Sequence, residues 1–350
     1  MEAAIEARRR LRVPTIAGLS LLVGALALAG LALGPVDIAP SRVIATLAGG
    51  GSAAESAIIW QIRLPRIVLG LATGAALAVA GVALQGVLRN PLADPGLIGV
   101  TGGASLGAVA TIVLGSTVAG QLPEPMRPWL LPAAAFFGAA LVIAFVFALA
   151  RRGGETSVAT LILAGVAVNA IAGAAIGAFV YVSDDNQLRD LTFWTMGALG
   201  GAGWPLVLVA ACIVTIALPA LLGRARDLDL FQLGERAAFH AGLDIERSKR
   251  AIGLSVAIAV GGVTAAAGPI GFIGLVAPHL VRLAIGPRHG LLLPASALTG
   301  MALVLAADLA VRLAVPPAEP PIGLATSLIG GPFFLWLLLR GGRARHASGA

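Results

Sequence analysis

The sequence predicts an all-α integral membrane protein with about ten transmembrane helices and with both termini in the cytosol. Composition is the first observation: 58% of the 350 residues are hydrophobic and 12% are charged, and the mean hydropathy is +0.94. That charged fraction is about half the ~25% typical of soluble domains. Apolar runs of the ~20 residues needed to cross a bilayer recur along the whole chain. Basic residues gather between alternate runs, as the positive-inside rule requires.

Ten apolar runs are the expected spans, and prolines, glycines and charges separate them. They lie near residues 14–34, 62–88, 96–118, 128–150, 158–182, 203–222, 249–267, 270–286, 291–313 and 322–340. The first run is longer than the apolar core of a signal peptide, so it is expected to be a retained helix. Residues 1–350 are therefore treated as a single transmembrane domain.

The distribution of basic residues fixes the expected orientation. With a cytosolic N-terminus and ten crossings, eighteen of the twenty-four Lys and Arg residues fall in cytosolic segments. The net charge of +7 is thus explained by membrane orientation. Membrane lipid is expected as a partner, and nucleic acid is not.

The stretch from Leu64 to Gly107 holds two spans joined by RNPLADPG, a bend broken by two prolines on the cytosolic side. Glycines recur at a spacing of four in both spans, which stacks small residues on one helix face and predicts close helix packing. They are Gly70 and Gly74 in the first run, and Gly99, Gly103 and Gly107 in the second.

Several long motifs carry a resemblance to a known family. They are LPRIVLG, GAALAVAGVALQG, RNPLADPGLIGV, TLILAGVAVNA, GPIGFIGLVAPHLVRL and IGLATSLIGGPFFLWLL, in that order along the chain. Together they resemble the permease subunits of bacterial ABC importers for iron siderophores, haem and cobalamin. The resemblance implies an inner-membrane permease that works as a homodimer with two separate ATPase subunits and a periplasmic substrate-binding protein.

The residues themselves offer no catalytic, metal or cofactor site. The only lysine, Lys249, follows Glu-Arg-Ser and not the glycine-rich turn that a nucleotide-binding loop needs. The four histidines lack ligand spacing, and the single cysteine, Cys212, lies in an apolar run. ATP hydrolysis is therefore expected in a partner, and this chain is not expected to be an enzyme.

The longest cytosolic segment, residues 223–249, alternates apolar and charged residues at helical spacing and predicts one or two short amphipathic helices. A helix lying on the membrane surface is one interpretation. In the resembled family this position holds the helices that couple to the ATPase subunits. The matching residues are Leu233, Gly234, Glu235, Ala238 and Gly242.

Three outer arginines, Arg63, Arg66 and Arg312, lie at helix ends, where snorkelling to the interface is one explanation. The resemblance implies instead that they pair with glutamates of the binding protein. Asp308 stands four residues before Arg312, so a local salt bridge is expected in preference to a proton relay. The other spans are almost free of charge, which argues against the different-class alternative of an ion-coupled secondary transporter.

The cytosolic gate is expected at two places that match the family. They are Asn90 and Leu92 in the bend, and Thr156 and Ser157 after the fourth span. A turn-capping role for Asn90 is the structural alternative, and both roles are compatible.

The outer segment 183–202 contains Phe193 and Trp194, which are expected either in an interfacial aromatic belt or in the lining of a vestibule. This segment resembles haem permeases more than siderophore permeases. Haem is therefore the expected cargo, with ferric siderophore as the alternative and cobalamin as a weaker one.

Overall fold

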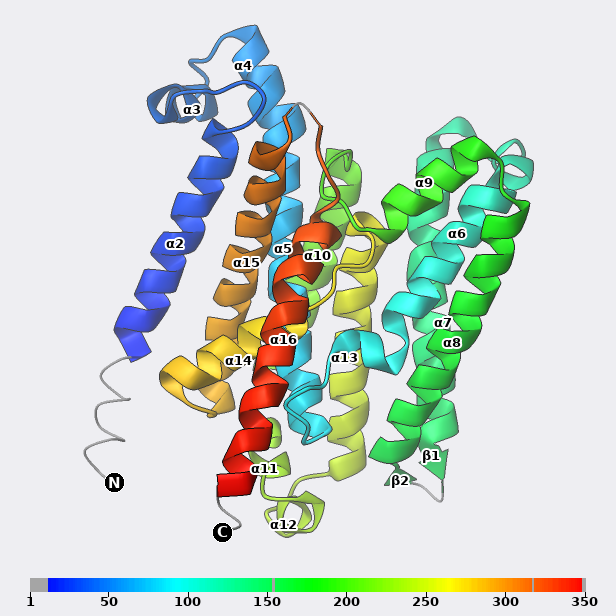
Figure 1. Cartoon of the computed structure of the whole chain (residues 1–350), viewed down its shortest axis with the longest axis vertical. Helices are drawn as coiled ribbons and strands as arrows, with labels where there is room; N and C mark the ends of the chain where they lie inside the picture. The colour runs from blue at the N-terminus through cyan, green and yellow to red at the C-terminus, as the bar shows by residue number, and fades with distance from the viewer. Residues whose placement is uncertain (1–11, 153–154, 317, 348–350) are drawn as a thin grey trace.

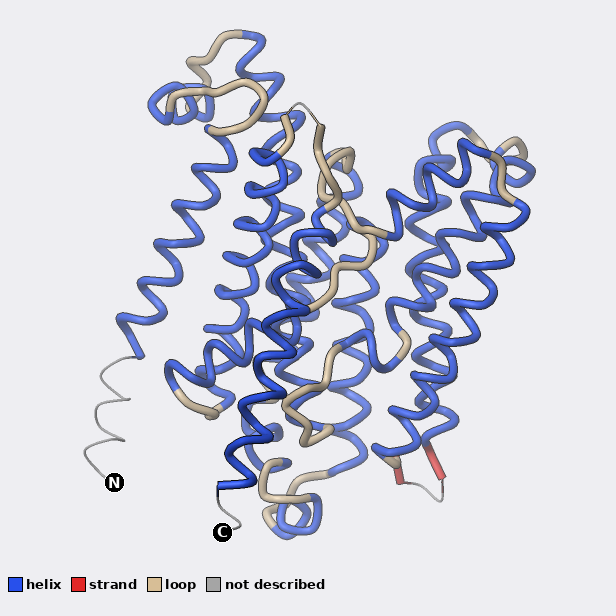
Figure 2. The backbone as a smooth tube through the Cα atoms, in the orientation of Figure 1, coloured by secondary structure: helices blue, strands red, loops and turns tan. Residues whose placement is uncertain are grey.

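The computed structural model describes residues 12–152, 155–316 and 318–347. These residues are almost entirely helical, as the sequence predicts, and long helices run side by side through the molecule (Figures 1 and 2). One small exception was not predicted. Strands β1 (Arg151–Arg152) and β2 (Glu155–Thr156) form an antiparallel pair in which Arg151 lies opposite Thr156.

Ten helices in the described part overlap the ten expected spans. They are α2 (Arg12–Ala32), α5 (Leu64–Val87), α6 (Val100–Ala119), α7 (Arg127–Ala150), α8 (Val158–Val182), α10 (Trp204–Leu222), α13 (Ile245–Ala267), α14 (Ile273–Ile285), α15 (His289–Ala314) and α16 (Ile322–Ala347). By length and composition, seven helical segments of the described residues are able to cross a membrane. The apolar parts of α6, α14 and α16 are shorter.

Helix α14 shows why the number ten stays a prediction. Its 13 residues rise only about 20 Å, whereas the hydrocarbon core is ~30 Å thick. The non-helical residues 268–272 connect it to the end of α13. The expected span 270–286 is therefore a half-length helix with an irregular approach, a form that membranes tolerate where protein surrounds the backbone.

Short helices cover both ends of the bundle. Near the outer end lie α3 (Pro40–Leu47), α4 (Ala53–Ala57), the π-helical η1 (Ile58–Arg63), η3 (Glu124–Met126) and α9 (Asp185–Thr195). Toward the inner end lie α11 (Ala225–Phe231) and α12 (Glu235–His240), whereas η2 (Pro95–Ile98) packs against the middle of α8. Capping boxes start two of them, Ser52 with Glu55 at α4 and Asp184 with Gln187 at α9.

The two ends of the chain approach the same side of the molecule. Helix α2 begins and α16 ends at the end that carries α11, α12 and the β1–β2 pair, opposite α3, α4 and α9 (Figure 1). This arrangement fits the expected cytosolic termini. Arg8, Arg9 and Arg10, which entered the count of basic residues, lie outside the described residues.

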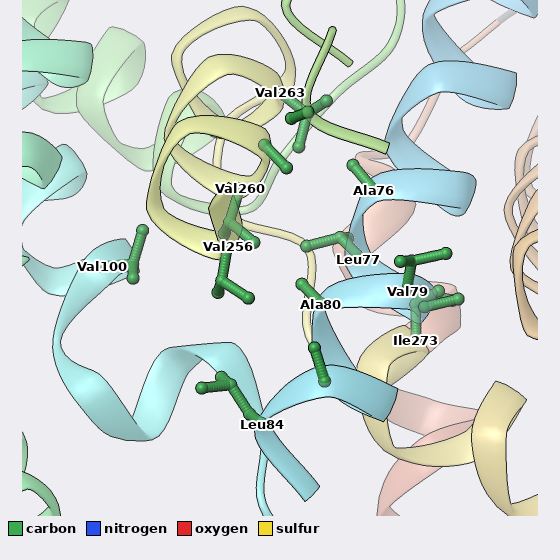
Figure 3. Packing of buried hydrophobic residues seen from close by; sticks show 14 of the residues in the cluster. Ala76, Leu77, Val79, Ala80, Leu84, Val100, Val256, Val260, Val263 and Ile273 are labelled. Atoms are coloured by element: carbon green, nitrogen blue, oxygen red, sulfur yellow. The ribbon is translucent and has the colours of Figure 1, made fainter. Parts of the chain in front are cut away.

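Helix α5 is the centre of the core. It is buried along almost its entire length and packs against α10, α13, α14 and α15. Figure 3 shows Leu77 of α5 extending toward Val256 and Val260 of α13, with Ile273 of α14 nearby. A helix that is apolar on every side is stable only when neighbours surround it, which is the position that α5 occupies.

The predicted glycine packing is confirmed at three positions. A Cβ at Gly74 would overlap the backbone of Gly300 on α15, and one at Gly103 or Gly107 would overlap the backbone of α7. These contacts bring helix backbones together where van der Waals packing drives association. For Gly99 the prediction of a helix stripe is wrong. It precedes α6 with φ +88°, because the chain there turns from η2 into α6 in a left-handed conformation that favours glycine.

Candidate functional site

The inner bend, residues 88–94, follows the end of α5. Arg89 adopts φ +49°, and the Oδ1 of Asn90 accepts a hydrogen bond from the Leu92 backbone N–H at 2.9 Å. Asn90 and Leu92 are both half-buried. The turn-capping role of Asn90 is thus confirmed, and its role in a gate stays a prediction.

Two amide side chains that the sequence reasoning did not single out hold this bend in place. The Nε2 of Gln85 on α5 donates to the carbonyls of Ala93 and Gly274, at 3.1 Å each. The Nδ2 of Asn169 on α8 donates to the Gly96 carbonyl at 2.8 Å. A lone amide within an apolar span was the available signal, because polar groups at membrane depth need internal partners.

Asp94 closes the bend with an Asx turn. Its Oδ1 accepts a hydrogen bond from the Gly96 backbone N–H at 2.8 Å. Burial raises the pKa of the Asp94 carboxyl, and the hydrogen bond from Gly96 opposes that shift. The residues that follow are thereby fixed at the start of η2.

The second predicted gate pair lies where β2 meets α8. Thr156 is buried, and its backbone N–H and Oγ1 donate to the two carboxylate oxygens of Glu246 on α13, at 2.9 and 2.6 Å. Ser157 is exposed and caps α8 by accepting a hydrogen bond from the Thr160 N–H. Thr156 is therefore anchored to α13, whereas Ser157 is the N-cap of α8.

The segments that hold the two gate pairs approach each other at the cytosolic end. Leu88, at the start of the inner bend, lines a small cavity together with Thr156 and Lys249. Among the described residues, no hydrogen bond joins Asn90 or Leu92 directly to Thr156 or Ser157. The structure thus brings the two segments to one region of the cytosolic end.

The cytosolic segment 223–249, named here the coupling loop, contains the two short helices that its pattern predicts. Helix α11 is anchored: Leu228 and Phe231 are fully buried, and the Oδ1 of Asp229 accepts hydrogen bonds from the backbone N–H and the ring Nδ1 of His289 on α15. The Ser248 hydroxyl of α13 also donates to Asp227 at 2.6 Å. Helix α11 therefore belongs to the body of the protein.

Helix α12 and the turn before it present apolar side chains to the outside instead. Leu233 and Phe239 are each 67% exposed, while Ala238 between them is buried. Gly234 and Gly242 flank the helix with φ +98° and +84°, a conformation that other residues adopt only at a cost. The five predicted coupling residues thus form one cytosolic projection, in which Ala238 is buried and the Glu235 carboxylate reaches the buried Lys249.

The three outer arginines are buried by this chain itself, with exposures of 3% for Arg63, 6% for Arg66 and 2% for Arg312. Arg63 donates to the carbonyls of Leu31 and Ala32, and Arg312 to those of Gly30 and Leu33. These carbonyls end α2, where cations are favourable. Docking of a partner by the arginines stays a prediction.

Arg66 forms the centre of a buried charge cluster. Its Nε lies 2.8 Å from Asp308 Oδ1, and its Nη1 pairs with Glu319. The expected Asp308–Arg312 salt bridge is present at 3.8 Å, but Arg66 is the closer partner of Asp308. Sequence spacing revealed only the pair within one helix, because Arg66 and Asp308 are brought together by the packing of α5 on α15.

Helix α9 covers a cavity near the outer end. Asp190, Phe193 and Trp194 are among its lining residues, and its volume is about 450 Å³. The Arg189 guanidinium lies 6.0 Å from the centre of the Phe193 ring, within the range of a cation–π contact. Both aromatic side chains line this cavity and Phe193 is also 50% exposed, so the choice between an aromatic belt and a vestibule stays a prediction.

A metal centre is not found in the described part of the chain, where no three His, Cys, Asp or Glu side chains come together. His279 instead places its ring 5.9 Å from that of Phe333 on α16.

Comparison with known proteins identifies this architecture. Residues 20–340 match the FecCD transport family. The hemin transport system permease protein HmuU of Yersinia pestis is 46% identical over 283 residues, which cover 81% of this chain and 83% of that protein. The cobalamin import system permease protein BtuC of Halobacterium salinarum is 44% identical over 282 residues, 80% of this chain and 73% of that protein.

A solved structure agrees with the sequence relatives. A metal-chelate type ABC transporter in an inward-facing conformation is similar with a TM-score of 0.81 and 30% identity, over 93% of this chain and 98% of that one. The chain therefore belongs to the FecCD transport family and is the permease subunit of an ABC importer, a multi-pass protein of the bacterial inner membrane.

Proposed function

We propose that this chain carries haem across the inner membrane as one half of a homodimeric pore, together with two ATPase subunits and a periplasmic binding protein. The identity of 46% to a hemin permease supports haem as the cargo. Phe193 and Trp194, which line the outer cavity beneath α9, supply aromatic faces suited to a flat, apolar macrocycle. Ferric siderophore and cobalamin are the alternative cargoes, the latter supported by an identity of 44% to a cobalamin permease.

The observation that carries the proposed mechanism is the contrast between α11 and α12. Helix α11 is fixed to α15 and α13, whereas Phe239 of α12 and Leu233 of the preceding turn are exposed beside it. Exposed apolar side chains on a cytosolic projection form the core of a docking surface for a partner protein. Movement of an ATPase bound at α12 therefore reaches the helices that surround the inner bend.

The exposed faces of α8 and α16 support pairing with a second copy. Leu163 and Ile171 of α8 are 69% and 68% exposed, and Leu328 of α16 is 76% exposed. In a homodimer these faces would line or border the shared pathway. Alternating access then results from the differential affinity of the ATPases and of the binding protein for two arrangements of the pair.

Reconstitution tests this function directly. The chain is placed in liposomes with the ATPase and the binding protein encoded beside it, and ATP hydrolysis is measured together with uptake of haem or of a ferric siderophore. Haem uptake with stimulated hydrolysis is expected. Uptake of siderophore alone would overturn the cargo, and uptake that follows a proton gradient without an ATPase would overturn the mechanism.

The same assay examines the coupling loop. Glu235→Gln and Gly242→Ala are expected to weaken transport by an ATP-driven permease, because both residues shape α12. A secondary transporter would keep its rate of transport after either change. Transport that is unchanged in both variants would therefore contradict the assignment of α12 as the coupling element.

A further inference from the structure

Lys249 is the only lysine of the sequence, and it is almost completely buried. It lies in the second turn of α13, and its side chain is 3% exposed. A buried ammonium group is costly unless charged or polar partners surround it. The partners of Lys249 therefore show what this position is built to hold.

Two of its partners belong to different segments of the cytosolic end. The Nζ of Lys249 donates to the backbone carbonyl of Thr156 at 3.0 Å and to Oε2 of Glu235 at 2.9 Å. Thr156 ends strand β2, and Glu235 begins α12. Lys249 is thus a direct link between the exposed coupling helix and a residue expected at the gate.

Glu246 completes the arrangement from one turn earlier on α13. Its two carboxylate oxygens accept hydrogen bonds from the Thr156 N–H and Oγ1, and one of them lies 3.7 Å from the Lys249 Nζ. Residues three apart share a helix face. Thr156 is therefore held at its N–H, hydroxyl and carbonyl by two neighbouring side chains of α13.

We infer that Lys249 is a positioning residue that transmits the displacement of α12 to Thr156 through its paired contacts with Glu235 and the Thr156 carbonyl. This inference rests on the proposed function. Glu235 is the partner that moves, because its side chain is 45% exposed on the helix that faces the ATPase. Glu246 is the partner that remains, because it shares α13 with Lys249.

The electrostatics give the link a direction. If α12 draws Glu235 away, the buried ammonium loses its nearest carboxylate and is attracted to Glu246. Glu246 then shares its oxygens between Lys249 and Thr156, and its hold on Thr156 weakens. Two alternative pairings of one buried charge form a bistable element of the kind that switching transitions need.

A small cavity lies between the Lys249–Thr156 contact and the start of the inner bend. Lys249 and Thr156 line the cavity together with Leu88, the first residue of the bend. A shift of Thr156 therefore changes the packing around Leu88, at the start of the inner bend. Both predicted gate segments are within reach of a single displacement of α12.

The test measures cargo uptake per ATP hydrolysed in the reconstituted complete importer. Lys249→Met keeps most of the unbranched apolar stem and removes the ammonium group, and it is expected to lower uptake per ATP about tenfold while basal hydrolysis remains. Lys249→Arg is expected to restore most of the ratio. Glu235→Gln is a second variant that leaves no cavity, and it is expected to lower the ratio in the same direction.

The charge swap and a neighbouring control separate transmission from simple stability. Lys249→Glu combined with Glu235→Lys is expected to recover part of the ratio that each single change loses. Arg250→Met removes a positive charge from the next residue, which is exposed, and is expected to leave the ratio unchanged. Equal losses of hydrolysis and uptake in Lys249→Met, matching a loss of folded complex, would overturn the inference.

Failure of the inference and failure of the proposed function give different results. If the unaltered complex couples hydrolysis to uptake and Lys249→Met and Glu235→Gln do so equally well, the function stands and the positioning role is refuted. If the unaltered complex neither hydrolyses ATP nor imports cargo, the proposed function is refuted, and the inference fails with it.

Discussion

The Nε of Arg66 on α5 donates to both carboxylate oxygens of Asp308 on α15, at 2.8 and 3.1 Å, across 242 positions of the sequence. Both side chains are buried. The pair joins the two most closely packed helices of the core near the outer end. Arg66 also pairs with Glu319, which precedes α16, so three segments of the chain meet at one guanidinium.

Asp308→Asn is expected to destabilise the protein strongly. The change leaves the volume nearly constant but removes a buried counter-charge of Arg66, at a cost on the order of 3 kcal/mol. Thermal unfolding in detergent measures the effect. Glu55→Gln is the matched control, because Glu55 pairs with the exposed Arg42 and such pairs contribute little. Equal unfolding temperatures for the two variants would show that the buried pair is not structural.

Glu319→Gln is expected to strengthen the association of the periplasmic binding protein. Glu319 is partly exposed and occupies the Nη1 of Arg66. If Arg66 docks acidic groups of the partner, removal of this internal competitor frees the guanidinium and speeds the encounter. Surface plasmon resonance on nanodiscs would measure the association rate, with Glu124→Gln as an outer control. A slower association than in the unaltered protein would contradict docking at Arg66.

Gly74→Ala is expected to impair folding, because the added Cβ meets the Gly300 backbone of α15. Overpacking of this kind costs about 1–3 kcal/mol. The yield of monodisperse protein and its unfolding temperature report the change. Gly173→Ala is the control, since nothing lies within 4 Å of a Cβ at that position of α8. If both variants behave alike, close contact between α5 and α15 is not required.

Gly234→Ala is expected to disturb the start of α12 without disturbing the core. Its φ of +98° and ψ of 152° lie in a region that is essentially restricted to glycine, and alanine there costs about 1–3 kcal/mol. Binding of the ATPase, measured by co-purification and by stimulated hydrolysis, should weaken. Gly223→Ala is the control, since Gly223 has φ −65°. Full ATPase binding by Gly234→Ala would show that the binding does not depend on the geometry of this turn.

Asn90→Asp and Asn90→Trp separate the turn role from the gate role. Asp keeps an oxygen that accepts the Leu92 N–H and is expected to retain uptake. Trp loses that bond and adds bulk at the half-buried bend, so uptake is expected to fall at least about tenfold at normal membrane abundance. Rapid haem uptake by Asn90→Trp would exclude Asn90 from the pathway.

Much of the fold follows from local sequence. The apolar runs determined which segments form the long helices, because the bilayer imposes a length and leaves every backbone group to bond within its own helix. Gly74 and Gly103 were recognisable as packing positions from spacing alone. The two short helices of the coupling loop were predictable from its amphipathic pattern, and the coupling role of its residues stays a prediction.

The tertiary structure alone decided which polar groups meet. Gln85 with Gly274, Arg66 with Asp308, and Lys249 with Thr156 are contacts between segments distant in sequence, and no periodicity encodes them. Sequence placed the outer arginines at helix ends, where a solvent-facing role was plausible. The fold buried Arg63 and Arg312 against the end of α2 instead, because its free carbonyls supply the acceptors that a guanidinium inside a membrane protein requires. It buried Arg66 against the carboxylates of Asp308 and Glu319.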